Sequence, residues 1–187
     1  MNNAEHKKAQ ELSAKKETKF IHHGRVLTIR QDILEYGLHK HSYEIIEHPG
    51  AVAILPILDT DTVILVSQWR RASNEILLEI PAGTLEKGED PIACAQRELQ
   101  EEIGYYAKSL TPYGGFFTAP GFCTEYIHLF IGKDLEERSL KGDEDEGIDI
   151  VSMTLDKALS LIETGKIRDA KTIATLYKYA FYRSKGV

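Results

Sequence analysis

The sequence predicts an α+β fold: an α/β/α sandwich in which helices cover both faces of a mixed β-sheet, with a small antiparallel sheet at the N-terminal end. Three observations predict it. Short β-rich runs come first, a helix-like segment follows at residues 91–103, and further β-rich runs precede two closing helix-like segments. Strands on both sides of a central helix, with terminal helices, favour a layered sheet covered on two faces.

The N-terminal part is first polar and then β-rich. Residues 1–18 are polar and Lys-rich, so we expect a frayed arm or a loose helix. Residues 19–50 contain the runs GRVLTIR and YEIIEH between turn signals, which predict a small sheet. A few strands alone are marginally stable in water, so we expect this part to pack across a homodimer.

Residues 51–187 are predicted to form the main domain. The runs AVAILPIL and TVILVSQW predict strands, and LLEIP at 77–81 predicts another that leads into a Gly-rich loop. The central helix is expected to begin with Asp90 as N-cap and Pro91 in the first turn, and to end at Gly104. Its apolar positions form one predicted core-facing stripe, made of Ile92, Ala95, Leu99 and Ile103.

The rest of the domain is predicted from the same signals. Strands are expected at 114–118, 126–131 and 148–153, with an acidic stretch at 134–146 before the last of them. Helices are expected at 155–164 and 170–182, and their N-caps are Thr154 and Asp169.

Charge and composition exclude several classes of function. The chain carries 23 Lys and Arg against 29 Asp and Glu and has no long basic block. A nucleic-acid binder needs a dense cationic surface, so we expect no nucleic-acid partner. No apolar run approaches the ~18 residues of a membrane span. Cys94 and Cys123 form no CxxC pair, so we expect reduced thiols, a cytoplasmic location and no membrane partner.

The most informative feature is an acidic cluster on the central helix. Glu98 is three residues from Glu101 and four from Glu102, so three carboxylates crowd one side. Like charges destabilise a helix, more so near its C-terminal end, and such breaks of local rules tend to mark functional sites. By itself the helix is also compatible with a solvated acidic face. A bound divalent cation is the natural compensation, because Mg²⁺ and Mn²⁺ prefer hard oxygen ligands.

The surrounding residues make the pattern specific. GTLEKGEDPIACAQRELQEEIGY has Gly83, five residues, Glu89, seven residues, and then Arg97-Glu-Leu-Gln-Glu-Glu-Ile-Gly104-Tyr105. This segment resembles the Nudix box, G-x5-E-x7-R-E-U-x-E-E-x-G-U with U bulky and apolar, at all seven fixed positions. A soft departure is Tyr105, where an aliphatic residue is usual. If each fixed position matches by chance with a probability of about 7%, all seven match at a given starting residue with a probability on the order of 10⁻⁸.

The resemblance to the Nudix family implies hydrolysis of a nucleoside diphosphate linked to another moiety. The implied cofactor is Mg²⁺, with Mn²⁺ as the alternative, because a divalent cation neutralises the diphosphate and acidifies a bound water. Arg97 is expected to position the acids by ion pairing, with Glu89 as one partner. The implied metal ligands are the carbonyl of Ala82 and the carboxylates of Glu98, Glu102 and, as a ligand or beside one, Glu101.

Segments outside the box narrow the substrate class. Gln68-Trp69-Arg70, followed by LLEIPAG, resembles the ADP-ribose pyrophosphatase branch of the family, in which the arginine contacts the diphosphate. Arg70 is therefore the first phosphate-binding candidate and Arg71 the second, with an ordinary surface pair as the alternative. Glu79 is expected near the nucleoside or the box, or in a structural ion pair.

Two further segments resemble the same branch. The run Ala119-Pro-Gly-Phe-Cys-Thr-Glu125 has the expected proline, with Ala119 in place of the usual serine, and Glu125 is expected to bind a ribose hydroxyl. The acidic run GDEDEGIDI at 142–150, followed by a helix and Ala170-Lys171-Thr172, also resembles the branch, which carries its general base on this acidic loop. The box carboxylates are committed to cations, so we expect the base to be Glu144, with Glu146 second and Glu101 as the fallback.

These observations predict a Mg²⁺-dependent pyrophosphatase that converts ADP-ribose and water to AMP and ribose 5-phosphate. A closely related alternative is action on another nucleotide sugar such as GDP-mannose. An alternative of a different class is a non-catalytic nucleotide-sensing module that keeps the fold alone. The intact set of box carboxylates argues against it.

Overall fold

The computed structural model describes residues 2–141 and 147–186. Its contacts divide the chain into two compact units: residues up to Pro49 together with Phe117–Tyr126, and Gly50–Phe116 together with the residues from Ile127 onward. Among the described residues, no helix combines the length and the apolar character needed to cross a bilayer.

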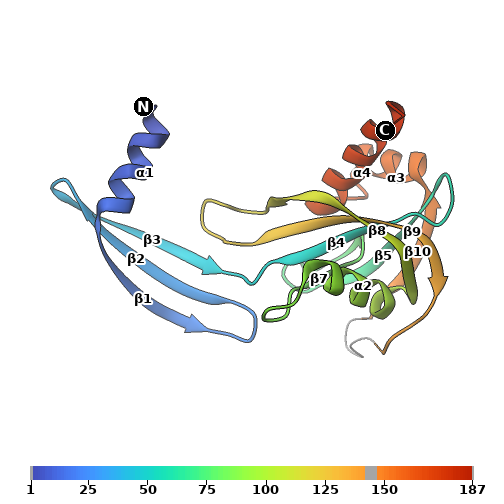
Figure 1. Ribbon diagram of the computed structural model, residues 1–187, viewed down its shortest axis with the longest axis horizontal. Coiled ribbons are helices and arrows are strands. Elements are labelled where there is room, and N and C mark those ends of the chain that lie inside the picture. Colours follow the sequence, from blue (N-terminus) through green and yellow to red (C-terminus); the bar gives the residue numbers. More distant parts are fainter. Residues whose placement is uncertain (1, 142–146, 187) are drawn as a thin grey trace. The chain divides into compact units, whose positions relative to one another are not determined.

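The first unit is a small antiparallel sheet with one helix. It contains α1 (Asn3–Ser13), β1 (Lys15–His23), β2 (Thr28–Tyr36) and β3 (His39–Glu47), with strand order β1-β2-β3 (Figure 1). α1 begins in a capping box between Asn2 and Glu5 and has no buried residue. The expected polar arm, residues 1–18, thus comprises α1 and the start of β1. Because β1 is almost entirely exposed, its sequence lacks the apolar alternation that signals a strand.

Residues Phe117–Tyr126 cluster with this first unit, although they were assigned to the main domain from sequence. The cause is main-chain pairing with the end of β3. The Ile46 N–H donates to the Phe122 carbonyl at 2.8 Å, and the Thr124 N–H donates to the Ile46 carbonyl at 2.9 Å. Such long-range backbone pairing has no local sequence signal.

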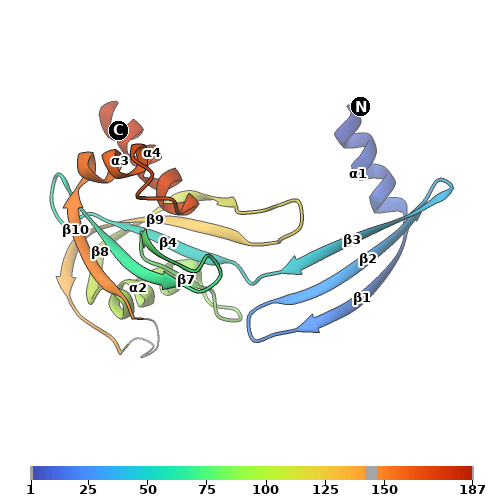
Figure 2. The ribbon, with the colours of Figure 1, turned by 180° about the vertical axis from the view of Figure 1, so that it is seen from behind.

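The second unit contains the predicted mixed sheet arrangement. One sheet has the order β10-β5-β6 and the other β7-β4-β9-β8, and Figure 2 shows them from behind. β4 pairs in parallel with β9, whereas its pairing with β7 is antiparallel. The strands are β4 (Ala51–Pro56), β5 (Thr62–Arg70), β6 (Glu75–Glu79), β7 (Ala82–Thr84), β8 (Tyr105–Phe117), β9 (Tyr126–Glu137) and β10 (Asp149–Thr154).

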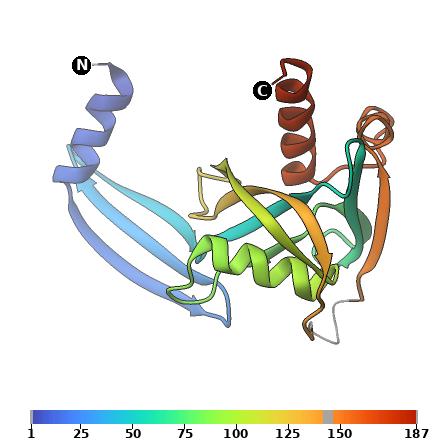
Figure 3. The same cartoon turned by 45° about the vertical axis from the view of Figure 1, so that its right-hand side comes forward.

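Helices cover both faces of these strands, as predicted. α2 (Pro91–Glu102) lies on one side, and α3 (Leu155–Glu163) and α4 (Ala170–Ser184) lie on the other (Figure 3). Every residue of β4 is buried, and successive side chains enter opposite cores. Val52 and Ile54 pack in the core with α2, whereas Ala53 and Leu55 pack in the core with α3 and α4.

Three sequence expectations need correction. The short strand β7 lies in the predicted Gly-rich loop, where three residues carry no alternation. β8 spans 13 residues, far more than the predicted 114–118. Ile92 is 46% exposed, so it is not part of the core stripe of α2. The buried arc is rotated toward Cys94, which is fully buried, because α2 packs on β4 and β7 with that side.

Two aliphatic residues of α2, one buried and one exposed, allow a matched stability test. Leu99 is fully buried in the core between α2 and the sheets, whereas Ile92 lies at the exposed start of the same helix. We expect Leu99→Ala to lower the free energy of unfolding by about 2–5 kcal/mol, and Ile92→Ala to change it by less than about 1 kcal/mol. Urea unfolding followed by circular dichroism measures both. Equal losses would contradict the packing described for α2.

Candidate catalytic site

The carboxyl-terminal half of α2 and the backbone of β7 form the centre of the site. α2 begins as the sequence predicts, with the Asp90 carboxylate accepting a hydrogen bond from the Ala93 N–H at 3.3 Å. It ends before Gly104, whose φ of +73° is the left-handed conformation that favours glycine. The helix packs directly on β7 and β4, which brings its acidic side chains to the Gly-rich segment.

Gly83 is required by close packing rather than by its backbone conformation. A Cβ atom at this position would lie 1.9 Å from the Cδ and Oε1 atoms of Glu98. The carboxylate of Glu98 therefore lies against the backbone of β7, and the residue as a whole is 8% exposed. The five-residue and seven-residue spacings of the box thus place a glycine beneath a buried carboxylate.

The guanidinium of Arg97 joins three of the box carboxylates. Its Nε and Nη2 atoms donate to the two oxygens of Glu89 at 3.0 and 3.1 Å. Its Nη1 atom donates to Glu98 Oε1 at 2.7 Å and to Glu101 Oε2 at 2.8 Å. One cation thus offsets the repulsion among carboxylates that share a helix side, which a salt bridge with a single partner would not do.

The pairing changes the acidity of neighbouring groups. Hydrogen bonds from Arg97 lower the pKa of Glu89 to about 2, against partial burial, which acts in the opposite direction. Cys94 lies on the same network, with its Sγ atom 3.3 Å from Arg97 Nη2. Burial, and then the neighbouring Glu89 carboxylate, raise the pKa of the Cys94 thiol to about 12. The sequence showed Cys94 only as a buried reduced thiol, because its proximity to Glu89 depends on how the loop folds onto α2.

Glu102 connects the helix to the backbone before the glycine. Its Oε2 atom accepts a hydrogen bond from the Ala82 N–H at 3.1 Å. The resemblance implies the carbonyl of the same residue as a backbone ligand, so the structure brings Ala82 and Glu102 together. Glu98, Glu101 and Glu102 belong to α2 and Ala82 to β7, and these two elements are in contact.

The donors in this region fit a divalent cation chemically. They are hard oxygens, and a Gly83 Cβ would fill space that the Glu98 carboxylate now occupies. Over residues 2–141 and 147–186, however, no three His, Cys, Asp or Glu side chains are gathered in a metal-holding arrangement. Arg97 binds one carboxylate oxygen of Glu98 and one of Glu101.

Arg70 and Glu79 form a second, separate network. The Nε and Nη2 atoms of Arg70 donate to the two oxygens of Glu79, both at 2.8 Å. Glu79 is 1% exposed and is also paired with Lys171. The hydrogen bonds that Arg70 donates to Glu79 raise the pKa of Arg70, and the charges of Glu102 and Asp169 add to this effect. Arg70 thus lies within the electrostatic range of the box, and the predicted structural ion pair of Glu79 is present.

Gln68 is a buried polar residue whose role the sequence does not indicate. It lies two residues before Arg70 in β5 and is 6% exposed. Its Oε1 atom is buried and has no hydrogen-bond partner among the described residues. The only local signal was a glutamine following the apolar run TVILVS, at a position where alternation expects a core residue.

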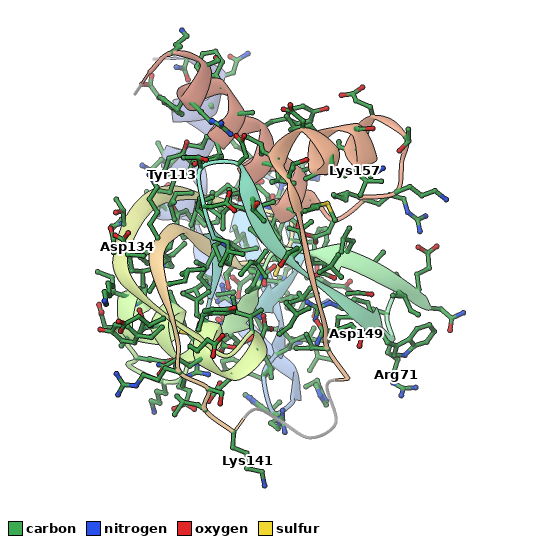
Figure 4. The ribbon with its side chains drawn as sticks, turned by 90° about the vertical axis from the view of Figure 1, so that its right-hand side faces the viewer. Arg71, Tyr113, Asp134, Lys141, Asp149 and Lys157 are labelled. Carbon is green, nitrogen blue, oxygen red and sulfur yellow. The ribbon has the colours of Figure 1, made fainter. Side chains whose placement is uncertain are left out.

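The remaining predicted residues lie elsewhere. Arg71 is exposed in the turn after β5, where its side chain points away from the sheets (Figure 4). Glu125 belongs to the first unit, where it accepts a 2.8 Å hydrogen bond from Thr118 Oγ1 and lies 3.5 Å from His48 Nε2. Glu144 and Glu146 lie outside the described residues.

Comparisons with known proteins agree on one family. The NUDIX domain model matches residues 47–176. The chain is 44% identical to an ADP-ribose pyrophosphatase of Bacillus subtilis over 157 residues, which cover 81% of this chain and 84% of the relative. It is 42% identical to a methanol dehydrogenase activator of Bacillus methanolicus, with coverages of 83% and 86%.

More distant relatives include a GDP-mannose pyrophosphatase of Citrobacter koseri, 34% identical, with coverages of 76% of this chain and 83% of the relative. A similar solved structure is that of an ADP compounds hydrolase. It superposes with a TM-score of 0.81 at 25% sequence identity, over 92% of this chain and 95% of that chain.

The contact between Gly83 and Glu98 gives a first test of the site. We expect Gly83→Ala to displace the Glu98 carboxylate and to weaken Mn²⁺ binding at least about tenfold, as loss of a well-oriented ligand does. Calorimetric titration with Mn²⁺ measures this. The control is Gly121→Ala, where an added Cβ meets nothing within 4 Å. Unchanged Mn²⁺ binding in Gly83→Ala would contradict a functional role for this close contact.

The lowered pKa of Glu89 predicts a pH dependence of stability. Because its pKa falls from an ordinary 4.5 to about 2 on folding, the Arg97 pairing contributes stability above pH 4.5. This contribution disappears as the pH falls toward 2. We therefore expect Glu89→Gln to be less stable than the wild type at pH 6 and to lose less stability between pH 4.5 and 2.

Urea unfolding midpoints at a series of pH values measure the effect. The matched control is Glu86→Gln, which removes an exposed carboxylate three residues earlier in the same loop. The prediction fails if Glu89→Gln and the wild type lose stability in parallel over this pH range.

Proposed function

The chain belongs to the NUDIX family, and on that premise we propose that it hydrolyses the pyrophosphate bond of ADP-ribose, giving AMP and ribose 5-phosphate. Nudix hydrolases generally need a divalent metal, and we propose Mg²⁺ here, with Mn²⁺ as a substitute. The relative named ADP-ribose pyrophosphatase supports this substrate over others.

One observation in the site supports the proposal most directly. The guanidinium of Arg97 donates short hydrogen bonds to three box carboxylates, where α2 packs over Gly83. These are the carboxylates of Glu89, Glu98 and Glu101. A helix with only a structural role does not need so many like charges. A site that binds cations for a polyanionic substrate does need them. A non-catalytic sensing module is disfavoured for the same reason.

The acidic platform would hold the cation through the carboxylates of Glu98, Glu101 and Glu102 and the carbonyl of Ala82. When bound there, a divalent cation supplies neutralisation of the diphosphate charge and makes water a better nucleophile. Arg97 keeps Glu98 and Glu101 beside the backbone of β7. It thereby orients these ligands before substrate arrives.

Arg70 is proposed to bind the diphosphate, with Arg71 as a weaker contributor. About two fifths of the Arg70 side chain is exposed while Glu79 holds its Nε and Nη2 atoms, so the guanidinium is both oriented and accessible. A planar guanidinium suits phosphate oxygens. Glu125 is proposed to bind a ribose hydroxyl, and Glu144, with Glu146 second, to accept the proton of the attacking water.

The proposal also covers assembly and location. The first unit, with its small antiparallel sheet, is proposed to pack across a homodimer, because a few strands are marginal alone. A small nucleotide sugar is the proposed partner, rather than nucleic acid or a membrane. Both cysteines are free, which supports a cytoplasmic location.

A second candidate substrate is GDP-mannose, favoured by the relatives named GDP-mannose pyrophosphatase at 33–34% identity. Incubation with ADP-ribose, GDP-mannose and other nucleotide sugars, with Mg²⁺ or with EDTA, distinguishes the candidates. We expect the highest kcat/KM for ADP-ribose and no product in EDTA. A preference for GDP-mannose would overturn the substrate assignment, and no product from any compound would favour the sensing module.

Removal of one ligand charge tests the acidic platform. Glu102→Gln keeps an oxygen that can accept from the Ala82 N–H but removes the negative charge. We expect kcat to fall at least about 10²-fold, scaled to the loss of one strong electrostatic contributor. The fold should be no less stable without metal, because a like-charge pair with Glu98 is gone. Steady-state rates in saturating Mg²⁺, with Glu86→Gln as the control, measure this; wild-type turnover in Glu102→Gln would refute the ligand assignment.

A further inference from the structure

Lys171 lies at the far side of the Arg70 network and was not assigned any role from sequence. It is in the first turn of α4, and its side chain is only 11% exposed. Its ammonium pairs with the buried Glu79 carboxylate and lies 3.1 Å from Asp169 Oδ1. A lysine this deeply buried is unusual unless its charge is used.

The surrounding contacts fix where this ammonium lies. Asp169 caps α4, accepting from the Thr172 N–H at 2.9 Å and the Thr172 hydroxyl at 2.5 Å. The same hydroxyl accepts from the Ile80 N–H at 2.9 Å, directly after β6. Thr172 is fully buried. The beginning of α4, which meets the strands in Figure 3, is therefore tied to the residue that follows Glu79.

The network around Glu79 pairs one carboxylate with two cations. Glu79 carries one negative charge and contacts two cations, Arg70 at 2.8 Å and Lys171. With Arg70 alone it would form a neutral pair, in which little net charge remains for a phosphate. With Lys171 the group of three is positive. Asp169 adds a negative charge beside Lys171, and this charge also acts on Arg70, although the amino end of α4 partly offsets it. With Lys171 the four groups are neutral together, and without it they would be negative.

The exposure of the three side chains shows where that positive charge is available. Glu79 is 1% exposed and Lys171 11%, whereas Arg70 is 40% exposed. Arg70 also interacts electrostatically with Glu102 of the box. The accessible part of the network is therefore the Arg70 guanidinium.

We propose that Lys171 is a positioning residue for substrate binding: it neutralises the Glu79 carboxylate, so that Arg70 keeps a net positive charge for the substrate diphosphate. This inference rests on the proposed function, because it requires a diphosphate-containing substrate. It adds a residue of α4, 66 positions after Tyr105 at the end of the box, to the determinants of affinity.

A purely structural role for Lys171 makes a different prediction. If the lysine only ties α4 to β6, its loss lowers stability but leaves the Kd for ADP-ribose unchanged in the folded protein. If it is the counter-charge of Glu79, neutralising Glu79 as well restores the net charge of Arg70. The double variant therefore separates the two roles.

The experiment is calorimetric titration with ADP-ribose in EDTA, where no turnover occurs, together with steady-state kinetics in Mg²⁺. We expect Lys171→Met to raise the Kd and the KM about tenfold, the effect of one charge-assisted contact, with kcat changed less than about threefold. Lys171→Arg, which keeps the charge, should bind within about threefold of the wild type. Glu79→Gln/Lys171→Met should bind at least about threefold more tightly than Lys171→Met.

Arg168→Met is the matched control. Arg168 also connects the segment before α4 to β6, through an ion pair with Glu75, but its side chain is 55% exposed. Its loss should leave the Kd unchanged. An unchanged Kd in Lys171→Met, or a double variant that binds no better than Lys171→Met, would overturn the inference.

The wild type separates this inference from the proposed function. If the wild type hydrolyses ADP-ribose and Lys171→Met retains its Kd, the inference fails while the proposed function stands. If the wild type neither binds nor hydrolyses any nucleotide sugar of the panel, both fail. Should Lys171→Met not fold, the double variant is compared with the wild type instead. A Kd within about threefold of the wild type supports the counter-charge role, and a Kd raised about tenfold overturns it.

Discussion

The candidate site depends on one guanidinium. Arg97 donates hydrogen bonds to the carboxylates of Glu89, Glu98 and Glu101 at distances between 2.7 and 3.1 Å. Without that cation, carboxylates on successive turns of α2 would repel one another near the negative end of the helix. The same contacts attach the loop before the helix to the helix itself, because Glu89 precedes α2. The arginine therefore stabilises the acidic cluster and fixes the loop at the same time.

Close packing also positions the carboxylates of the site. Glu98 is held against Gly83, where a single additional carbon would overlap its carboxylate. Glu102 is held by the Ala82 N–H, one residue earlier in the same short strand. Oxygen ligands and a backbone carbonyl thus come from two elements whose contact is set by the core beneath them. Because protein cores are densely packed, small shifts of α2 would change the spacing of all these groups together.

The Glu79 network shows a related arrangement on the neighbouring strands. A buried carboxylate is again satisfied by cations, here Arg70 from β5 and Lys171 from α4. Removing one partner of such a buried group is costly, which explains why α4 is capped and tied to the backbone after β6 by Asp169 and Thr172. The two networks differ in exposure. Arg97 is largely enclosed by acids, whereas Arg70 keeps part of its guanidinium open to a ligand.

The amino-acid sequence by itself determined the features that depend on short spacing. The cap at Asp90, the end of α2 at Gly104 and the order of carboxylates around Arg97 follow from residues within about twenty positions of one another, which local hydrogen bonds and helix periodicity control. The predicted mixed sheet and the helices on its two faces also follow, because period and turn signals are local.

Tertiary structure decided what depends on distant partners. The strand β7, the pairing of Phe117–Tyr126 with β3, the exposure of Ile92 and the approach of Lys171 to Glu79 all arise from contacts between residues far apart in the chain. None of these has a periodic pattern or a fixed spacing that a sequence can reveal. In the sequence Lys171 lies in a segment that resembles the family branch but indicates no role for it. Only the fold places its charge, in nearly buried surroundings, beside a carboxylate 92 positions away.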